Sequence, residues 1–129
     1  MLKTGILNPH LASLLARVRH TNTLVIADRG FPFWPQIETV DLALVDDIPT
    51  VLDVLRAIRP NFAIRQVWMA DEFLTQNTEA TRARFAEGLA GLATSYEPHL
   101  QLKQRVPTAI GLVRTGDTLQ YANMILESG

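Results

Sequence analysis

Residues 20–30 read HTNTLVIADRG, and we expect the rest of the chain to be organised around them. Its middle, Leu24 to Ala27, is a short apolar run rich in β-branched residues, with polar residues and a glycine on either side. Such a run is typical of a strand buried in a sheet that is covered on both faces. Asp28 follows at the carboxyl end of the predicted strand, where open α/β sheets place their ligand crevices. His20 precedes the strand, and we expect the imidazole and the carboxylate to belong to one site.

Helical and extended patterns alternate along the rest of the chain. A helix is predicted to begin at Pro9, with Asn8 as its N-cap and His20 at its exit. This alternation predicts a single three-layer α/β/α domain with a mixed β-sheet over residues 1–129. The other predicted elements are strands at 39–45 and 63–70, helices opening at Pro49 and at Asn77 or Thr78 (the latter through Ala93), a short helix at 100–106, and strands at 109–114 and 121–126 that form an antiparallel hairpin.

Composition excludes several classes of protein. The chain has 129 residues, a net charge of −1 and no cysteine, so disulfides, thiolate zinc sites and cysteine nucleophiles are ruled out. Its basic residues are scattered, whereas nucleic-acid binding needs a concentrated basic field. We see neither a signal peptide nor an apolar run near the ~20 residues of a membrane span. We therefore expect a soluble, cytoplasmic protein that binds no nucleic acid and no membrane.

Two polar residues near the end of the chain are candidate ligands for a polyhydroxylated ring. In the predicted strand 121–126, Tyr121 and Asn123 share one face, and together they offer a phenol, two amide donors and an acceptor. An edge strand with two polar side chains in water explains the pair equally well. His20 and His99, each taken alone, are more typical of histidines stabilised at a helix end than of catalysts.

The loop at residues 29–35 reads RGFPFWP and is unusually apolar. Two prolines and a glycine exclude regular structure here. An exposed loop of this kind is costly, so we expect it to pack over a pocket or against a neighbouring subunit. Phe31, Phe33 or Trp34 is then placed to stack on a ligand ring.

Acidic residues near predicted strand ends suggest a competing function. Carboxylates gathered at one sheet edge bind Mg²⁺ and support phosphodiester hydrolysis. The chain has no basic substrate track, however, and no histidine–carboxylate spacing typical of a metal site. The acidic residues concerned are Asp28, Asp41, Asp46, Asp47, Asp71 and Glu72.

Taken in order, these pieces resemble the D-ribose pyranase and L-fucose mutarotase family (RbsD/FucU). The resemblance spans nearly the whole chain, and its order and spacing make it specific. It is carried by Leu2-Lys3, Gly5-Ile6-Leu7-Asn8, His20-Thr21, the run from Thr23 to Asp28, Gly30, Pro32, Asp41-Leu42-Ala43-Leu44, Pro49, Arg114-Thr115-Gly116-Asp117 and the run from Tyr121 to Leu126.

The resemblance implies that the protein interconverts cyclic forms of a free monosaccharide without a cofactor or metal. His20 matches the catalytic histidine of the family, and His99 favours the ribose pyranase branch, since the fucose branch has arginine there. The family further implies a ring-shaped, decamer-type homo-oligomer with sites at subunit interfaces. The sugar-binding residues that the resemblance implies are Asp28, His99, Lys103, Tyr121 and Asn123.

Three departures from the family pattern lie near His20 and Asp28. The family usually reads Gly-His-Thr-Asp where this chain has Arg19-His20-Thr21-Asn22, and Arg29 replaces a small residue.

Opening a sugar ring needs one acid/base that works near neutral pH, which suits histidine. We therefore expect a ribose pyranase. The alternatives are an L-fucose-type mutarotase, a non-catalytic sugar-binding module and a metal-dependent nuclease.

Overall fold

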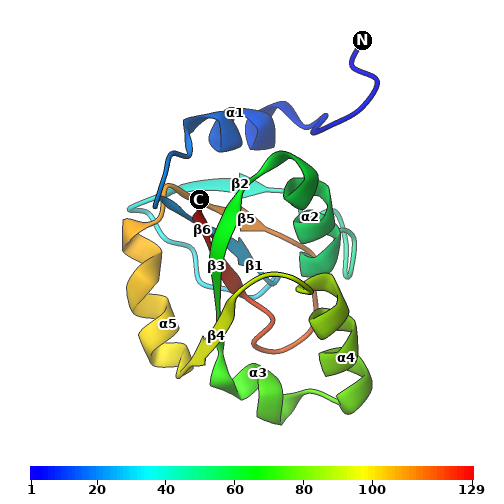
Figure 1. Ribbon diagram of the computed structural model, residues 1–129, viewed down its shortest axis with the longest axis vertical. Helices are drawn as coiled ribbons and strands as arrows, with labels where there is room; N and C mark the ends of the chain where they lie inside the picture. The colour runs from blue at the N-terminus through cyan, green and yellow to red at the C-terminus, as the bar shows by residue number, and fades with distance from the viewer.

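The computed structural model describes all residues from 1 to 129 and consists of a mixed six-stranded sheet with helices on both faces (Figure 1). The strand order is β2-β5-β1-β6-β3-β4. The strand predicted at residues 24–27 is β1 (Thr23–Ala27), and it lies inside the sheet. Leu24, Val25, Ile26 and Ala27 are all fully buried, as the apolar run indicates. The other strands are β2 (Glu38–Asp41), β3 (Ile64–Ala70), β4 (Thr94–Glu97), β5 (Gly111–Arg114) and β6 (Met124–Ser128).

Two apolar clusters, one on each face of the sheet, confirm the three-layer α/β architecture. The larger cluster joins the sheet to the first four helices, and the smaller one joins it to α5 and the loop after β1. Figure 1 shows α5 separated from α2 and α4 by the sheet. None of the helices has the length and apolar character that crossing a bilayer requires. The helices are α1 (Pro9–Arg17), α2 (Val51–Ile58), α3 (Asp71–Gln76), α4 (Glu79–Gly88) and α5 (His99–Arg105), with single 3₁₀ turns at Arg59–Asn61 and Val106–Thr108.

Side-chain caps set where three of these helices begin. The Asn8 side chain accepts a hydrogen bond from the backbone N–H of Leu11, which confirms the predicted start of α1. Thr50 and Asp53 form a capping box, so α2 begins just after Thr50 rather than at Pro49. Thr78 is the N-cap of α4.

The predicted hairpin of the last two strands is wrong, because β1 lies between them. β1 pairs in parallel with β5 and antiparallel with β6. The connection between β5 and β6 is not a tight turn, since it is tied to other parts of the fold through buried Thr115 and Asp117. The last strand therefore begins at Met124 rather than at residue 121.

Several element boundaries also differ from the sequence prediction. α1 ends at Arg17, so His20 lies in a turn beyond the helix. α4 ends at Gly88 instead of Ala93, and β2 ends at Asp41 instead of residue 45. The short elements α3 and β4 were not expected. β4 depends on tertiary contacts, because it is a four-residue edge strand that pairs only with β3.

Candidate functional site

A pocket of about 300 Å³ opens at the carboxyl end of β1. It brings together Asp28, His99, Tyr121 and Asn123, four of the residues singled out from the sequence. They come from three separate parts of the chain: the end of β1, the start of α5 and the segment before β6. The rest of the lining is Gly30, Phe31, Pro32 and Gln120.

Asp28 is the fixed carboxylate of this pocket. Its backbone N–H donates to Asn123 Oδ1 at 2.7 Å, and its own Oδ1 accepts from the Gly30 N–H at 2.9 Å. Burial raises the pKa of Asp28 above its ordinary value, while hydrogen bonds from Gly30, Asn123 and the Phe31 N–H act against that rise. The carboxylate is thus a partly desolvated acceptor with a defined direction.

The backbone around Asp28 is held by the segment that follows β5. The Ala27 carbonyl accepts from both the Thr115 N–H at 2.9 Å and the Thr115 Oγ1 at 2.8 Å. The Arg29 N–H donates to the Asp117 carbonyl at 3.0 Å. Asp117 is itself buried, and its Oδ2 accepts from the Val51 N–H at the start of α2. This end of the sheet is therefore rigid before any ligand arrives.

His99 is held between two aromatic rings at the first position of α5. The centroid of its ring lies 6.3 Å from that of Phe31 and 5.1 Å from that of Tyr121, both in edge-on geometry. Its backbone N–H donates to the carboxylate of Glu72, at 3.0 Å to Oε1. Nδ1 is buried and has no partner within the chain. Packing against Phe31 and Tyr121 thus orients the imidazole, while the Glu72 contact holds the backbone at the start of α5.

The surroundings of His99 favour the neutral form of its imidazole. Burial lowers its pKa, and the nearby positive charge of Lys103 lowers it further, against the opposing effects of Glu72 and Asp28. Lys103 lies on α5, half-buried, and it is not among the residues that line the pocket. The contribution of Lys103 that the structure shows is this electrostatic effect on His99.

Tyr121 and Asn123 reach the pocket from an irregular segment rather than from a strand face. Tyr121 has a φ of 57°, in the left-handed region, and it precedes β6. Asn123 is 2% exposed, and its Oδ1 is already used by the N–H of Asp28. Strand alternation was therefore the wrong reason for pairing these residues, although both do line the pocket.

His20 lies at the opposite end of β1 from Asp28. It is exposed, its imidazole makes no hydrogen bond within the chain, and it does not line the pocket. The turn that carries it is nevertheless ordered: the Thr21 N–H donates to the Ser128 carbonyl, and the Arg19 N–H donates to Asn22 Oδ1. A single chain therefore does not bring His20 and Asp28 into one site, because β1 separates them.

The acidic residues near strand ends do not gather into one cluster. Asp41 pairs with Arg114, and Asp46 pairs with Arg29. Asp47 accepts from Thr118, while Glu72 accepts from the N–H of His99. No group of three or more histidine or acidic side chains has a geometry that could hold a metal ion. This arrangement does not favour the nuclease interpretation.

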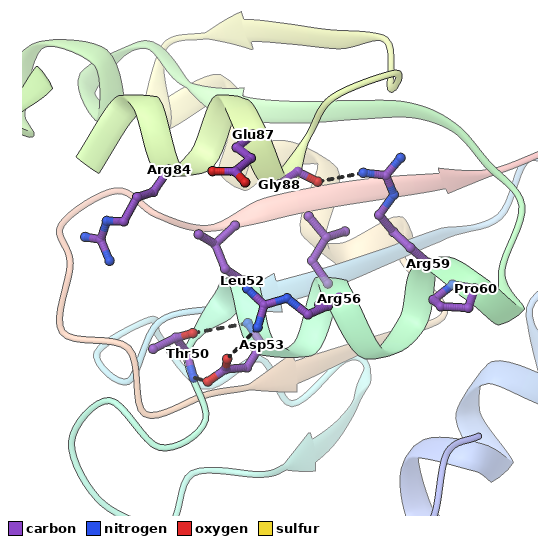
Figure 2. A pocket seen from close by; sticks show the side chains of 10 residues that line it. Thr50, Leu52, Asp53, Arg56, Arg59, Pro60, Arg84, Glu87 and Gly88 are labelled. Carbon is purple, nitrogen blue, oxygen red and sulfur yellow. Dashed lines mark hydrogen bonds and ion pairs between the residues drawn. The ribbon is translucent and has the colours of Figure 1, made fainter. Parts of the chain in front are cut away.

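A larger cavity, of about 630 Å³, lies between α2 and α4 (Figure 2). The guanidinium of Arg59 donates to the carbonyls of Gly88 and Ala90, so it stabilises the carboxyl end of α4. Arg56 pairs with Asp53 on its own helix. The cations of this groove thus have partners within the fold, and none of the predicted site residues lies there.

Sequence reasoning did not identify the residues that hold the pocket. Thr115 and Asp117 carry a recognisable signal, since they surround a glycine directly after a buried apolar strand. A Cβ at Gly116 would clash with the Val45 carbonyl, so only glycine fits this close approach. Glu72 was considered only as a metal ligand, and Gln120 gives no signal in the sequence.

Comparison with known proteins places the chain in a family. The model of the RbsD / FucU transport protein family matches residues 1–129. A D-ribose pyranase of Bacillus cereus (strain ATCC 10987 / NRS 248) is 38% identical over 129 residues, which cover 100% of this chain and 98% of the relative. A D-ribose pyranase of Geobacillus kaustophilus (strain HTA426) is 40% identical over 132 residues, covering 100% and 94%. The chain therefore belongs to the RbsD/FucU family.

Solved structures agree with this assignment. The structure of Bacillus subtilis RbsD complexed with D-ribose matches with a TM-score of 0.89 and 33% identity, covering 100% of this chain and 98% of that chain. The fucose mutarotase of Streptococcus pneumoniae in complex with L-fucose matches with a TM-score of 0.79 at 20% identity, covering 99% and 98%, and shows a shared fold. The family and fold expected from the sequence are thus confirmed.

Proposed function

We propose that this protein is a cofactor-independent monosaccharide pyranase, an isomerase that interconverts the cyclic forms of a free sugar, with D-ribose as the first candidate. The observation that carries the proposal is the pocket at the end of β1. It gathers a carboxylate, an imidazole, a phenol and an amide in a volume of about 300 Å³. Relatives that cover the whole chain are named D-ribose pyranases, and a similar protein has been solved with D-ribose.

The residues of the pocket suit a sugar ring. The Asp28 carboxylate can accept hydrogen bonds from hydroxyl groups, and a ring nitrogen of the neutral His99 imidazole can accept or donate one. Tyr121 and Phe31 give apolar ring surface next to these polar groups. Nearly every ring carbon of ribose carries a hydroxyl group, which leaves little apolar area and matches a pocket with few hydrophobic residues.

The reaction itself needs little from the protein. Ring opening removes the proton of the anomeric hydroxyl and protonates the ring oxygen, and reclosure from another hydroxyl gives a different ring size. Closure on the opposite face of the carbonyl gives the other anomer. Because ring opening proceeds unaided in water, general acid–base catalysis of roughly 10²- to 10⁴-fold is a sufficient rate enhancement. In the proposed mechanism His20 moves these protons, while Asp28, His99, Tyr121 and Asn123 hold the sugar.

This mechanism requires His20 to come from a neighbouring subunit. Its exposed imidazole at the far end of β1 is available to the pocket of an adjacent copy, and a ring-shaped homo-oligomer of the decamer type supplies such a neighbour. Exposed apolar side chains that lie next to one another support an association of this kind, because contiguous apolar patches mark interaction surfaces. The Leu44 N–H donates to the Ile48 carbonyl, so these two residues are neighbours. Phe33 is 77% exposed, Leu44 76% and Ile48 55%.

Saturation-transfer NMR on a small panel of free sugars tests the proposal. The protein is mixed with D-ribose, L-fucose or D-glucose, with and without a chelator, and exchange between the anomeric signals is measured. We expect faster exchange for D-ribose that the chelator does not change. A ligand-induced rise in melting temperature without faster exchange would indicate a sugar-binding module instead. Chelator-sensitive cleavage of nucleic acid would indicate the nuclease, and preference for L-fucose the other branch of the family.

A further inference from the structure

Arg114, at the end of β5, contacts the backbone next to Asp28. Its Nε and Nη2 donate to the Arg29 carbonyl at 3.2 and 3.1 Å. Its Nη1 donates to both oxygens of Asp41 at 3.2 and 3.1 Å. Asp41 ends the neighbouring strand β2 and lies opposite Arg114 in the sheet register. The guanidinium is thus fixed on one side by a carboxylate and is directed by its other side at one peptide carbonyl.

That carbonyl belongs to the peptide group that also orients the Asp28 carboxylate. In the peptide that joins Arg29 to Gly30, the carbonyl accepts hydrogen bonds from Arg114, and the N–H donates to Asp28 Oδ1 at 2.9 Å. In a trans peptide the two groups point in opposite directions, so fixing the carbonyl also fixes the direction of the N–H. A cation on the carbonyl also polarises the peptide and strengthens the hydrogen bond that its N–H donates.

We propose that Arg114 is a positioning residue of the sugar site: held by Asp41, it fixes and polarises the 29–30 peptide so that the Gly30 N–H aims and stabilises the Asp28 carboxylate. Arg114 itself does not line the pocket. The inference rests on the proposed function in one respect only, namely that Asp28 binds the substrate.

A purely stabilising role does not account for this arrangement. The side chains of Arg114 and Asp41 are 38% and 53% exposed, and an ion pair at that exposure adds little to the free energy of unfolding. Arg114 donates two hydrogen bonds to the Arg29 carbonyl, which no other group in the chain binds. The effect of the pair is therefore expected at Asp28 rather than in overall stability.

Several charged and titratable groups around Asp28 act on its pKa, and a pH experiment has to distinguish their effects. His99 faces it from α5, and Asp117 acts on it from the segment after β5, raising its pKa. Its own loop contributes the Gly30 N–H, which lowers that pKa. Weakening the Gly30 bond leaves burial and Asp117 less opposed, so removal of Arg114 should raise the pKa of Asp28. The acidic limb of the kcat/KM profile should then move to higher pH.

The test compares Arg114→Gln, Arg114→Lys and Asp41→Asn with the control Arg56→Gln, which removes an exposed arginine on α2 far from the site. We expect KM for D-ribose to rise roughly 3- to 30-fold in Arg114→Gln, with kcat and the melting temperature little changed. The KM values of Arg114→Lys and Asp41→Asn should lie between those of Arg114→Gln and wild type, because each variant keeps part of the hydrogen-bonding geometry around the guanidinium. Arg56→Gln should behave as wild type.

A second measurement works without turnover. The Asp28 carboxyl carbon is titrated by NMR in wild type and in Arg114→Gln, and the pKa should be higher in the variant. Unchanged KM and an unchanged Asp28 titration in Arg114→Gln would overturn the inference, as would a loss of affinity that only follows a large fall in melting temperature. Wild-type protein that neither exchanges nor binds sugars would instead reject the proposed function, and the Asp28 titration would still decide the role of Arg114.

Discussion

The two ends of β1 differ in how completely they are held. At the carboxyl end, the backbone from Ala27 to Gly30 is bonded to Thr115, Asp117, Asn123 and Arg114. At the amino end, the turn is tied to β6 through its backbone, but the His20 imidazole is exposed and unbonded. One end thus forms the candidate pocket within a single chain, whereas the other presents an imidazole that has no partner in its own chain.

This difference suggests a division of work between binding and proton transfer. A pocket that must recognise hydroxyl groups gains from fixed acceptors, because little ordering remains to be done when the sugar binds. A proton-transfer group presented to another subunit is placed by the assembly rather than by its local contacts.

Replacing His20 should remove catalysis and leave the binding end intact. We expect His20→Ala to lower the sugar exchange rate by roughly 10²- to 10⁴-fold, since general acid–base catalysis contributes that much. Its affinity for the sugar and its melting temperature should stay near wild type. Saturation-transfer NMR and calorimetry make the two measurements. Unchanged exchange in this variant would remove His20 from the mechanism.

Mixing two inactive variants should restore part of the activity if the two ends meet across subunits. His20→Ala keeps Asp28, and Asp28→Asn keeps His20. In randomly mixed rings, about a quarter of the sites combine both wild-type residues from adjacent copies. Co-expression followed by exchange measurements checks this fraction. Mixed oligomers as inactive as either parent would show that the two residues do not share a site.

Thr115→Val should loosen the carboxyl end of β1, because it removes hydrogen bonds that hold the backbone there. It removes the hydroxyl that donates to Ala27 and leaves the buried Asp117 N–H without its acceptor. We expect a loss of about 1–3 kcal/mol in the free energy of unfolding, together with a higher KM. Urea denaturation measures the first effect. The matched control Thr118→Val, at an exposed position, should lose much less.

Acidification should destabilise the fold through His99. Because burial lowers the pKa of His99 below 6.5 in the folded protein, the unfolded chain binds more protons in the interval between the two values. The free energy of unfolding therefore rises with pH through that interval and falls as the pH drops below 6.5. Chemical denaturation at a series of pH values should show a shallower slope for His99→Gln than for wild type. Parallel slopes would contradict a depressed pKa.

Thr21→Gly at the amino end should have the smallest effect. Thr21 has a φ of 66°, which a β-branched residue adopts with strain, although the backbone there is tied to β6. Relief of that strain and the added flexibility of glycine oppose each other, so we expect the free energy of unfolding to change by less than about 1 kcal/mol. A larger loss would mean that the amino end is held as tightly as the carboxyl end.

The sequence predicted the parts of the fold that local pattern determines. The buried β1, the N-cap of α1 and the three-layer architecture all followed from apolar runs and capping residues. The pairing of β5 and β6 did not, because a glycine turn between two strands is equally compatible with a hairpin and with a third strand inserted between them. The inserted strand is decided by contacts between residues far apart in sequence, such as Leu24 with Gly111 and with Leu126.

The candidate site likewise contains residues that the sequence indicated and residues that it did not. Residue type and family resemblance indicated Asp28, His99, Tyr121 and Asn123, and the structure brings these four together. The hydrogen-bond partners of Thr115, Asp117 and Arg114 were not predicted, because these side chains bond to backbone groups of distant residues. The glycine between Thr115 and Asp117 signals a close approach but does not identify those partners. The proposed meeting of His20 with the pocket involves a second subunit, and neither local sequence pattern nor the fold of one chain determines such a contact.

The position of β1 also governs how this protein can be synthesised. Both of its partners, β5 and β6, lie near the end of the chain. At a translation rate of about 5–20 residues per second, an emerging β1 waits several seconds on the ribosome before either partner exists. A nascent chain halted before residue 111 has two unpaired edges on its most apolar strand. Premature termination therefore yields aggregation-prone fragments rather than a smaller folded domain.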